Sequence, residues 1–146
     1  MHWKPDITVA AVVERNGRFL IVEERIGRRR VFNQPAGHVE HGEDLLGAVV
    51  RETLEETAWH FEPRWLLGVY RWRATRSAHG TLRFAFTGHL IRHEAQRELD
   101  SPVLAVHWLT RPELLARARA LRTPLVMQCV DDYLAGRRLP LSAVAT

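Results

Sequence analysis

Cysteine and long apolar stretches are both nearly absent from this 146-residue chain. Its single cysteine, Cys129, cannot form an internal disulfide, so we expect a reducing, cytoplasmic setting. The strongly apolar runs are short, around 7–13 and 19–22, which excludes a membrane-spanning helix of about 20 residues. The N-terminal MHWKPD has no charged region followed by an apolar core, so no signal peptide is expected. The remaining composition, 46% hydrophobic and 26% charged, is typical of one globular domain over residues 1–146.

Lysine is as scarce as cysteine. Of the 21 basic residues only Lys4 is a lysine and the rest are arginine, and the net charge is +4. Arginine binds phosphate oxygens through paired hydrogen bonds, so this balance suits an anionic ligand, although a genome's codon bias would produce it equally well. No stretch interleaves basic and aromatic residues beyond Arg71-Trp72-Arg73. We therefore expect a small phosphorylated substrate and neither a nucleic-acid nor a membrane partner.

The residues that carry chemistry gather before and within one predicted helix. The spacing predicts a helix over 43–57, in which Glu52, Glu55 and Glu56 share one face. An apolar stripe for docking this helix consists of Leu45, Leu46, Val49, Val50 and Leu54. Acidic runs on helices are most often solvated faces. Three crowded carboxylates repel one another, however, and a hard divalent cation with oxygen ligands, Mg²⁺ or Mn²⁺, gives the arrangement a reason.

The spacing of these residues matches a known motif. Six positions follow the Nudix box, GX5EX7REUXEEXGU with U a bulky apolar residue: Gly37, Glu43, Arg51, Glu52, Glu55 and Glu56. The chain therefore resembles the Nudix hydrolase family. Thr53 departs from the pattern where an apolar residue is typical, and Ala58 replaces the glycine that usually ends the helix. Only glycine adopts a left-handed cap at no steric cost, so either Ala58 takes that conformation or the helix runs on through Trp59.

Alternation and turn residues predict strands around this helix. Asn16-Gly17 is a strong turn signal and is expected to join the first two strands in a hairpin. The expected strands cover 7–13, 19–23, 31–34, 64–72, 82–90 and, as the last, 103–109. Loops are expected at 26–30, 74–80 and 92–101, and further helices from 111 and over about 124–135. This pattern predicts an α/β fold with a mixed β-sheet and helices on both faces, and the resemblance independently implies an α/β/α sandwich.

The expected site follows from the chemistry of phosphoric anhydrides. Such a substrate repels an attacking water, and a divalent cation neutralises charge and lowers the pKa of a bound water. The expected metal ligands are three side chains and, by the resemblance, one backbone carbonyl: Glu52, Glu55, Glu56 and Ala36. One of the glutamates or an acid outside the motif takes the proton from water. Arg51 lies four residues before Glu55 and can reach Glu43, so it is expected to orient the carboxylates, and Glu52, Glu55, Arg51 and Glu43 form the catalytic set.

Candidates outside the motif are weaker, because each residue type is more often structural or solvated. The resemblance suggests an acid from a loop late in the sheet: Glu94, Glu98 or Asp100, with Asp100 favoured because it stands just before the last strand. Candidate phosphate contacts are Arg25, Arg28, Arg29, Arg30, Arg71, Arg73 and Arg83. Candidates for stacking on a ring are Trp72, Phe32 and Phe84. His38 and His41 flank the motif's loop and are expected near the substrate, since no third ligand supports a zinc site.

Segments beyond the motif extend the resemblance over most of the chain. FNQPAGHVE, LRFAFTGHL, TPLV and DDYLAGRRLPL look like the NudJ group of bacterial Nudix phosphatases. The resemblance implies a phosphohydrolase that acts on nucleoside di- and triphosphates or on hydroxymethylpyrimidine diphosphate and releases orthophosphate. Two alternatives stay open: an RNA-end or ADP-ribose pyrophosphohydrolase, and a non-catalytic nucleotide-binding regulator. The complete set of motif residues favours the enzyme, and the sequence leaves the oligomeric state open.

Overall fold

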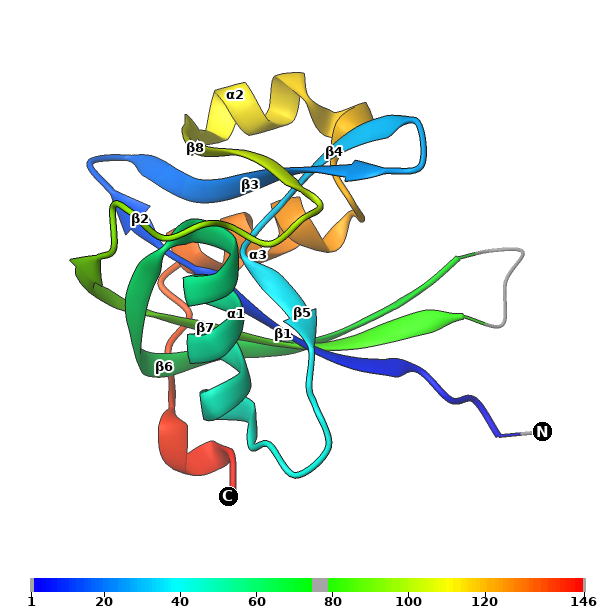
Figure 1. Cartoon of the computed structure of the whole chain (residues 1–146). Helices are drawn as coiled ribbons and strands as arrows, with labels where there is room; N and C mark the ends of the chain where they lie inside the picture. The colour runs from blue at the N-terminus through cyan, green and yellow to red at the C-terminus, as the bar shows by residue number, and fades with distance from the viewer. Residues whose placement is uncertain (1, 75–78, 146) are drawn as a thin grey trace.

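Two β-sheets form the framework of the computed structural model, which describes residues 2–74 and 79–145 (Figure 1). The larger sheet has the order β5 (Ala36–His38), β1 (Asp6–Val12), β7 (Gly80–His93), β6 (Trp59–Arg73) and β9 (Leu139–Pro140). It is mixed, because β1 runs parallel to β7 whereas the other neighbours are antiparallel. The smaller sheet is antiparallel and contains β2 (Glu14–Arg15), β3 (Arg18–Ile26), β4 (Arg29–Asn33) and β8 (Val103–Thr110).

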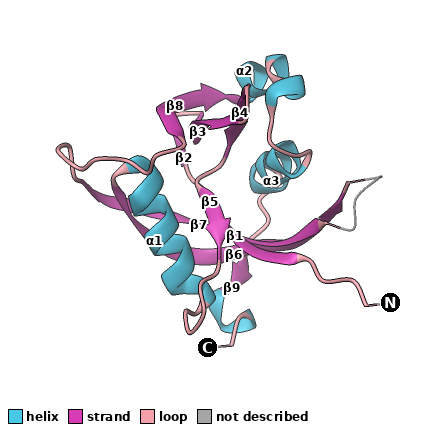
Figure 2. Ribbon diagram, turned by 45° about the vertical axis from the view of Figure 1, so that its right-hand side comes forward, coloured by secondary structure: helices cyan, strands magenta, loops and turns pink. Residues whose placement is uncertain are grey.

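Helices cover both faces of the larger sheet. The helices are α1 (Leu45–Thr57), α2 (Arg111–Ala116) and α3 (Leu125–Leu134), with 3₁₀ turns at Ala118–Ala120 and Leu141–Ala143. Alternate residues of β1 face two cores: Ala10 packs in the core that contains α3 residues, and Val9 packs in the core that contains α1 residues. Figure 2 shows α1 and α3 on opposite sides of the sheet. The predicted α/β/α arrangement with a mixed sheet is therefore confirmed.

The strands nevertheless divide into two sheets, where the sequence suggested one. The first strand ends at Val12 and pairs with β5 and β7, so the expected hairpin between the first two strands is wrong. The hairpin instead joins β2 to β3 through Asn16 and Gly17, whose φ angles are 52° and 78°. Two positive φ angles are what a tight hairpin turn requires. The position of the turn was therefore predicted correctly, but the strand that it joins to β3 was not. Strand pairing depends on contacts between residues that are far apart in the sequence.

Three further boundaries differ from expectation. The basic loop expected at 26–30 is a turn at Gly27 and Arg28, because β3 and β4 pair through Arg29. The strand 103–109 is not the last one, since β9 follows it and pairs with β6. The loop expected at 74–80 lies partly outside the described residues, at 75–78. No helix within the described ranges is long and apolar enough to cross a membrane.

Both ends of α1 are set by identifiable local interactions. The helix begins at Leu45, later than predicted, because the Asp44 side chain accepts a hydrogen bond of 2.7 Å from the Gly47 N–H and caps it. At the other end Ala58 takes the left-handed conformation, with φ 64° and ψ 13°, and its N–H donates to Leu54 O. Of the two conformations open to Ala58, the structure therefore has the left-handed cap. Thr53 is fully buried with its hydroxyl bonded to Val49 O, so its methyl group packs as an apolar residue would.

Candidate active site

A pocket of about 480 Å³ lies where residues of the larger sheet, the smaller sheet, α1 and the segment before α3 meet. One wall consists of positions paired across neighbouring strands: Thr8 of β1 pairs with both His38 of β5 and Arg83 of β7. Other walls come from the smaller sheet, from the segment before α3 and from α1, through Glu24, Asn33, Arg122, Thr123, Glu52 and Glu56. The pocket thus brings together residues from most parts of the chain.

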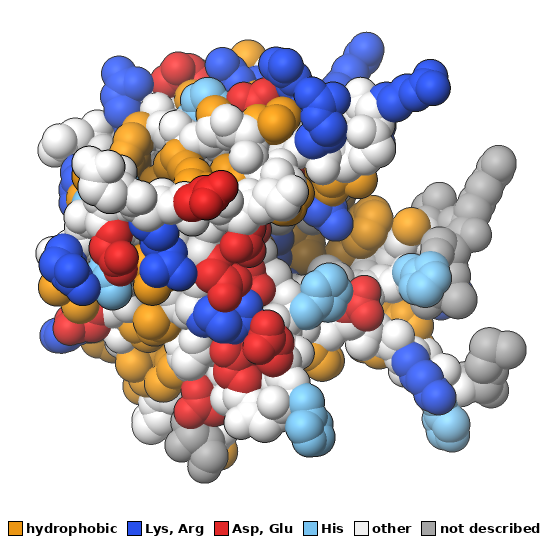
Figure 3. All heavy atoms as spheres, viewed as in Figure 1, with side chains coloured by type: hydrophobic (Ala, Val, Ile, Leu, Met, Phe, Trp, Pro, Cys, Tyr) orange, Lys and Arg blue, Asp and Glu red, His pale blue; other side chains and the backbone are white. Residues whose placement is uncertain are grey.

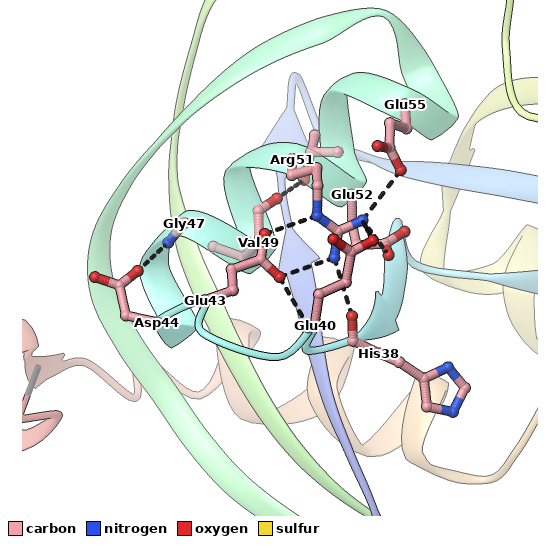
Figure 4. A network of polar contacts seen from close by, with 10 residues as sticks. His38, Glu40, Glu43, Asp44, Gly47, Val49, Arg51, Glu52 and Glu55 are labelled. Atoms are coloured by element: carbon pink, nitrogen blue, oxygen red, sulfur yellow. Dashed lines mark hydrogen bonds and ion pairs between the residues drawn. The ribbon is translucent and has the colours of Figure 1, made fainter.

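Arg51 organises the acidic face of α1 (Figure 4). Its Nε and Nη2 donate to the two oxygens of Glu43 at 2.7 and 3.0 Å. Its Nη1 donates to Glu52 Oε1 at 2.8 Å and to Glu55 Oε2 at 3.1 Å, and Nη2 also reaches His38 O at 3.0 Å. The predicted contacts of Arg51 with Glu43 and Glu55 are therefore present. One guanidinium serves three carboxylates, which leaves the cluster with an excess of negative charge.

Burial and crowding change the pKa values of these acids. Figure 3 shows acidic side chains gathered around a basic one on this face. The hydrogen bond from Arg51 lowers the pKa of Glu43. Burial raises the pKa of Glu52 in spite of its contact with Arg51. Burial, and then the charge of Glu24, raises the pKa of Glu56 to about 9, so that carboxyl is protonated at neutral pH when nothing else neutralises it.

The strand β5 brings the predicted ligands close together. Glu56 Oε1 accepts a hydrogen bond of 2.8 Å from the backbone N–H of Ala36. The Glu52 carboxylate lies so close to Gly37 that a Cβ at this position would be 2.2 Å from the Glu52 carboxyl carbon. A side chain at position 37 would therefore displace the Glu52 carboxylate from its place beside β5. The result is that Glu52, Glu56 and the backbone of Ala36 meet at one edge of the pocket.

The donor set fits a hard divalent cation in kind, since every predicted donor is an oxygen. Within 2–74 and 79–145, no three His, Cys, Asp or Glu side chains already converge on a common metal position. Arg51 instead occupies one oxygen of Glu52 and one of Glu55. The carboxylates thus stand side by side with an arginine as their counter-ion, and the second oxygen of each is the one that can turn toward a cation.

The three candidate acids outside the motif lie in different surroundings. The Asp100 N–H donates to Glu55 O at 3.0 Å, and the Asp100 charge contributes to the raised pKa values of Glu52 and Glu56. Glu94 contacts His60 instead, and this hydrogen bond lowers the pKa of Glu94. Glu98 is exposed. Asp100 is therefore the candidate that the fold places beside the α1 carboxylates.

The candidate substrate contacts separate into two groups. His38, Trp72 and Arg83 line the pocket. The other basic candidates are outside its lining: Arg25, Arg28, Arg29, Arg30, Arg71 and Arg73. The pairing of β3 with β4 carries the first four along the smaller sheet and its turn. The Arg71 guanidinium lies 5.9 Å from the Trp3 ring centroid, and His41 is exposed outside the pocket.

Sequence reasoning missed several charged residues of the pocket: Asp6, Glu24, Glu40 and Arg122. Glu24 is only 6% exposed, burial raises its pKa, and its carboxylate lies 3.4 Å from Arg122 Nη1. Arg122 lies nearly one hundred positions later in the chain, so no local pattern joins the two. A signal for Glu24 did exist, because two adjacent glutamates at the end of an apolar strand must place one side chain inward.

Arg83 is the buried cation of the pocket. It is 4% exposed and donates from Nη1 to Gln34 Oε1 at 2.7 Å and from Nη2 to Asn33 Oδ1 at 2.9 Å. Gln34, itself 1% exposed, donates from Nε2 to Val126 O at 2.9 Å. The Cys129 sulfur lies 4.0 Å from Arg83 Nη1, and burial raises the pKa of this thiol. Arg83 is therefore fixed between the larger sheet and α3.

Comparisons with known proteins agree with this geometry. The NUDIX domain family model matches residues 4–129. The chain is 37% identical over 142 residues to Phosphatase NudJ of Escherichia coli strain K12, covering 97% of this chain and 92% of the relative. A NUDIX hydrolase from Nitrosomonas europaea has a TM-score of 0.94 and 42% identity, with 98% and 97% of the two chains covered. A MutT NUDIX hydrolase from Burkholderia pseudomallei, 21% identical over 88% of this chain and 98% of its own, shares the fold with a TM-score of 0.74.

The chain therefore belongs to the Nudix family and is a hydrolase that acts on phosphoric anhydrides. The resemblance to the NudJ phosphatases that the sequence suggested is confirmed.

Proposed function

We propose that this protein is a divalent-metal-dependent phosphohydrolase that cleaves nucleoside di- or triphosphates, or a related diphosphate such as hydroxymethylpyrimidine diphosphate, by attack of water on phosphorus. The observation that carries the proposal is the acidic cluster of α1: Arg51 is bonded to Glu52 and Glu55, and Glu52 and Glu56 stand together in the wall of a pocket. The similarity to NudJ phosphatases supports the release of orthophosphate rather than pyrophosphate.

The chain's own groups have distinct roles in this proposal. Glu52, Glu55 and Glu56, with the carbonyl of Ala36, supply oxygen donors, and Mg²⁺ or Mn²⁺ would neutralise phosphate charge and lower the pKa of a bound water there. Arg51 holds Glu52 and Glu55 in place while Glu43 fixes Arg51, through hydrogen bonds of 2.7 to 3.1 Å.

Glu55 is our candidate for accepting the proton from the attacking water. Its carboxylate is more accessible than that of Glu52, with 30% of the side chain exposed against 12%. Only one of its oxygens is bonded to Arg51, so the other can reach a water molecule. Asp100 stands next to the same turn of the helix and is the alternative base.

The single buried thiol supports a reducing compartment such as the cytoplasm for this reaction.

A panel assay tests the proposal. Purified protein is given GTP, GDP, ADP-ribose and hydroxymethylpyrimidine diphosphate with Mg²⁺, with Mn²⁺ or after removal of metal, and orthophosphate and pyrophosphate are measured separately. We expect orthophosphate from GTP or GDP and from the pyrimidine diphosphate, and no turnover without metal. Glu98→Gln, which changes an exposed acid outside the pocket, is the matched control and should behave as wild type.

Two outcomes would contradict the proposal in different ways. Full turnover in thoroughly metal-stripped protein would remove the metal role of the glutamates. Pyrophosphate as the sole product from GTP, or hydrolysis of ADP-ribose alone, would place the protein in a different Nudix subgroup.

A further inference from the structure

Arg83 combines deep burial with incomplete pairing. Its guanidinium is bonded to two neutral amide oxygens, of Gln34 and Asn33, and the described residues provide no carboxylate as a salt-bridge partner. Its Nε–H is buried and has no hydrogen-bond partner among the residues that the structure describes. Buried cations are ordinarily paired with an anion, because dipoles alone replace little of the lost hydration. Arg83 is therefore a buried cation that lacks an anionic partner among the described residues.

The neighbours of Arg83 hold it in one orientation. The Val126 carbonyl accepts from the amide nitrogen of Gln34, so the amide oxygen of Gln34 must face Arg83. A guanidinium has five N–H donors, and these two amides use one on each terminal nitrogen. The Nε–H has no acceptor and at least one terminal N–H remains, and arginine binds phosphate oxygens through such donors. The guanidinium thus keeps donors for a phosphate while its neighbours fix its orientation.

The position of Arg83 in the pocket separates it from the carboxylates. By register, β1 lies between Arg83 on β7 and the β5 strand where Glu52 and Glu56 meet. Two strand spacings are about 10 Å, so a group at Arg83 is a neighbour of the metal-binding edge without sharing its ligands. Arg122 brings a second arginine to the pocket, where its Nη1 lies 3.4 Å from the Glu24 carboxylate, and its backbone N–H donates to Phe32 O beside Asn33. The pocket therefore has an acidic end and a cationic end.

We propose that Arg83, held by Asn33 and Gln34, binds an anionic phosphate group of the substrate other than the one placed at the glutamates. The proposal rests on the proposed function, since a phosphoric anhydride carries at least two phosphate groups. In this proposal Arg83 selects substrates that carry a second phosphate. Substrates with a neutral group beside the reacting phosphate are excluded. The assignment needs no metal, because the cationic end exists in the protein alone.

Metal-free protein and a small anion give the cleanest test. Protein freed of metal, and then of chelator by dialysis, is titrated with inorganic pyrophosphate at constant ionic strength, by calorimetry and by thermal melting. Without metal the α1 carboxylates repel anions, so binding must occur elsewhere. We expect pyrophosphate to raise the melting temperature of wild type, and Arg83→Gln to weaken its binding at least about tenfold. Arg18→Gln, which removes an exposed arginine outside the pocket, should match wild type.

A second variant keeps the test decisive if Arg83→Gln folds poorly. Arg83→Lys keeps the charge but loses the paired donors, and we expect it to weaken pyrophosphate binding several-fold. The proposal is overturned if wild type shows no binding up to about 10 mM pyrophosphate, or if Arg83→Lys binds as tightly as wild type. Failure of the proposed function would look different, because pyrophosphate binding would then be intact while metal-dependent hydrolysis was absent.

Discussion

Two arginines have opposite surroundings: Arg51, which is bonded to Glu52 beside the acidic end of the pocket, and Arg83, which lines the cationic end. The Arg51 side chain is 21% exposed and is hydrogen-bonded to Glu43, Glu52 and Glu55, with the Glu40 carboxylate 3.6 Å away. Arg83 is almost fully buried, and its hydrogen-bond acceptors in the described residues are two amide oxygens and, at 4.0 Å, the Cys129 sulfur. At one end negative charge is in excess and attracts a cation, whereas at the other end positive charge is in excess and attracts an anion. The same residue type thus has two different tasks, which its neighbours decide.

Substitution of the glutamates should give the largest effect. Its dependence on metal should distinguish the acidic end of the pocket from the cationic end. Glu52→Gln and Glu56→Gln each remove a metal donor, so turnover with saturating Mg²⁺ should fall by about two to four orders of magnitude. Both variants should also lose most of the Mg²⁺-induced rise in melting temperature, since a ligand that binds only the folded state stabilises it. Without metal they should melt no lower than wild type, because Glu52→Gln removes a like charge and Glu56→Gln replaces a carboxyl that is already protonated at neutral pH. Wild-type turnover in both variants would remove the acidic end as the catalytic end.

Gly37→Ala tests whether the acidic end depends on close packing against β5. The new Cβ would lie within 2.4 Å of the Glu52 carboxylate oxygens, so this flexible side chain must move away. We expect turnover to fall about 100-fold, as displacement of a catalytic group by an ångström does. Pyrophosphate binding by the metal-free variant should be unchanged, since Arg83 lies two strands away. Equal losses of turnover and of pyrophosphate binding would mean that the variant disturbs the whole pocket.

The pKa of Glu56 predicts a pH effect on the metal-free protein. Its folded-state value of about 9 lies above the ordinary value of 4.5, so the folded state holds a proton that the unfolded state releases. Stability from this group is therefore fully present below about pH 4.5 and is lost as pH rises toward 9, by at most about 1.4 kcal/mol per pH unit. Urea unfolding of wild type and Glu56→Gln between pH 5 and 9 should show a smaller decline for the variant. Parallel curves would contradict the assigned pKa.

Ala58→Gly should give the smallest effect and should leave both ends of the pocket unchanged. Ala58 has φ 64°, where glycine avoids the steric cost of a Cβ, but its methyl group is buried and contributes to packing. We expect the free energy of unfolding to rise by roughly 0.5 kcal/mol, measured by urea denaturation. A loss of stability would show that methyl burial outweighs backbone strain at this position.

The acidic end could be predicted from the sequence, whereas Arg83 was one of seven arginines proposed as phosphate contacts and its partners could not be predicted. Glu52, Glu55 and Glu56 are close because a helix fixes their spacing, and Arg51 reaches Glu55 by the same rule. Arg83 meets Gln34 across 49 positions, and Gln34 meets Val126 across 92, through strand pairing and helix packing that no local pattern encodes.

The fold shows the same division between local and distant information. The Asn16-Gly17 turn and most strands could be read from short patterns, because turn geometry and alternation are local. The division into two sheets could not, since it depends on whether Val12 and Leu20 find partners in β7 or in β8. Glu24 was missed for this reason: it lies on β3 and is buried where the smaller sheet lines a pocket together with residues of the larger sheet.

The single thiol under Arg83 has a practical consequence. Cys129 is the only cysteine of the chain, it is fully buried, and burial raises the pKa of its thiol, so a small alkylating reagent should not reach it in the closed molecule. Its labelling rate would then report how often α3 lifts from the sheet. Alkylation of Cys129, followed by mass spectrometry, would therefore measure how often the cationic end opens in the wild-type chain, with no engineered probe.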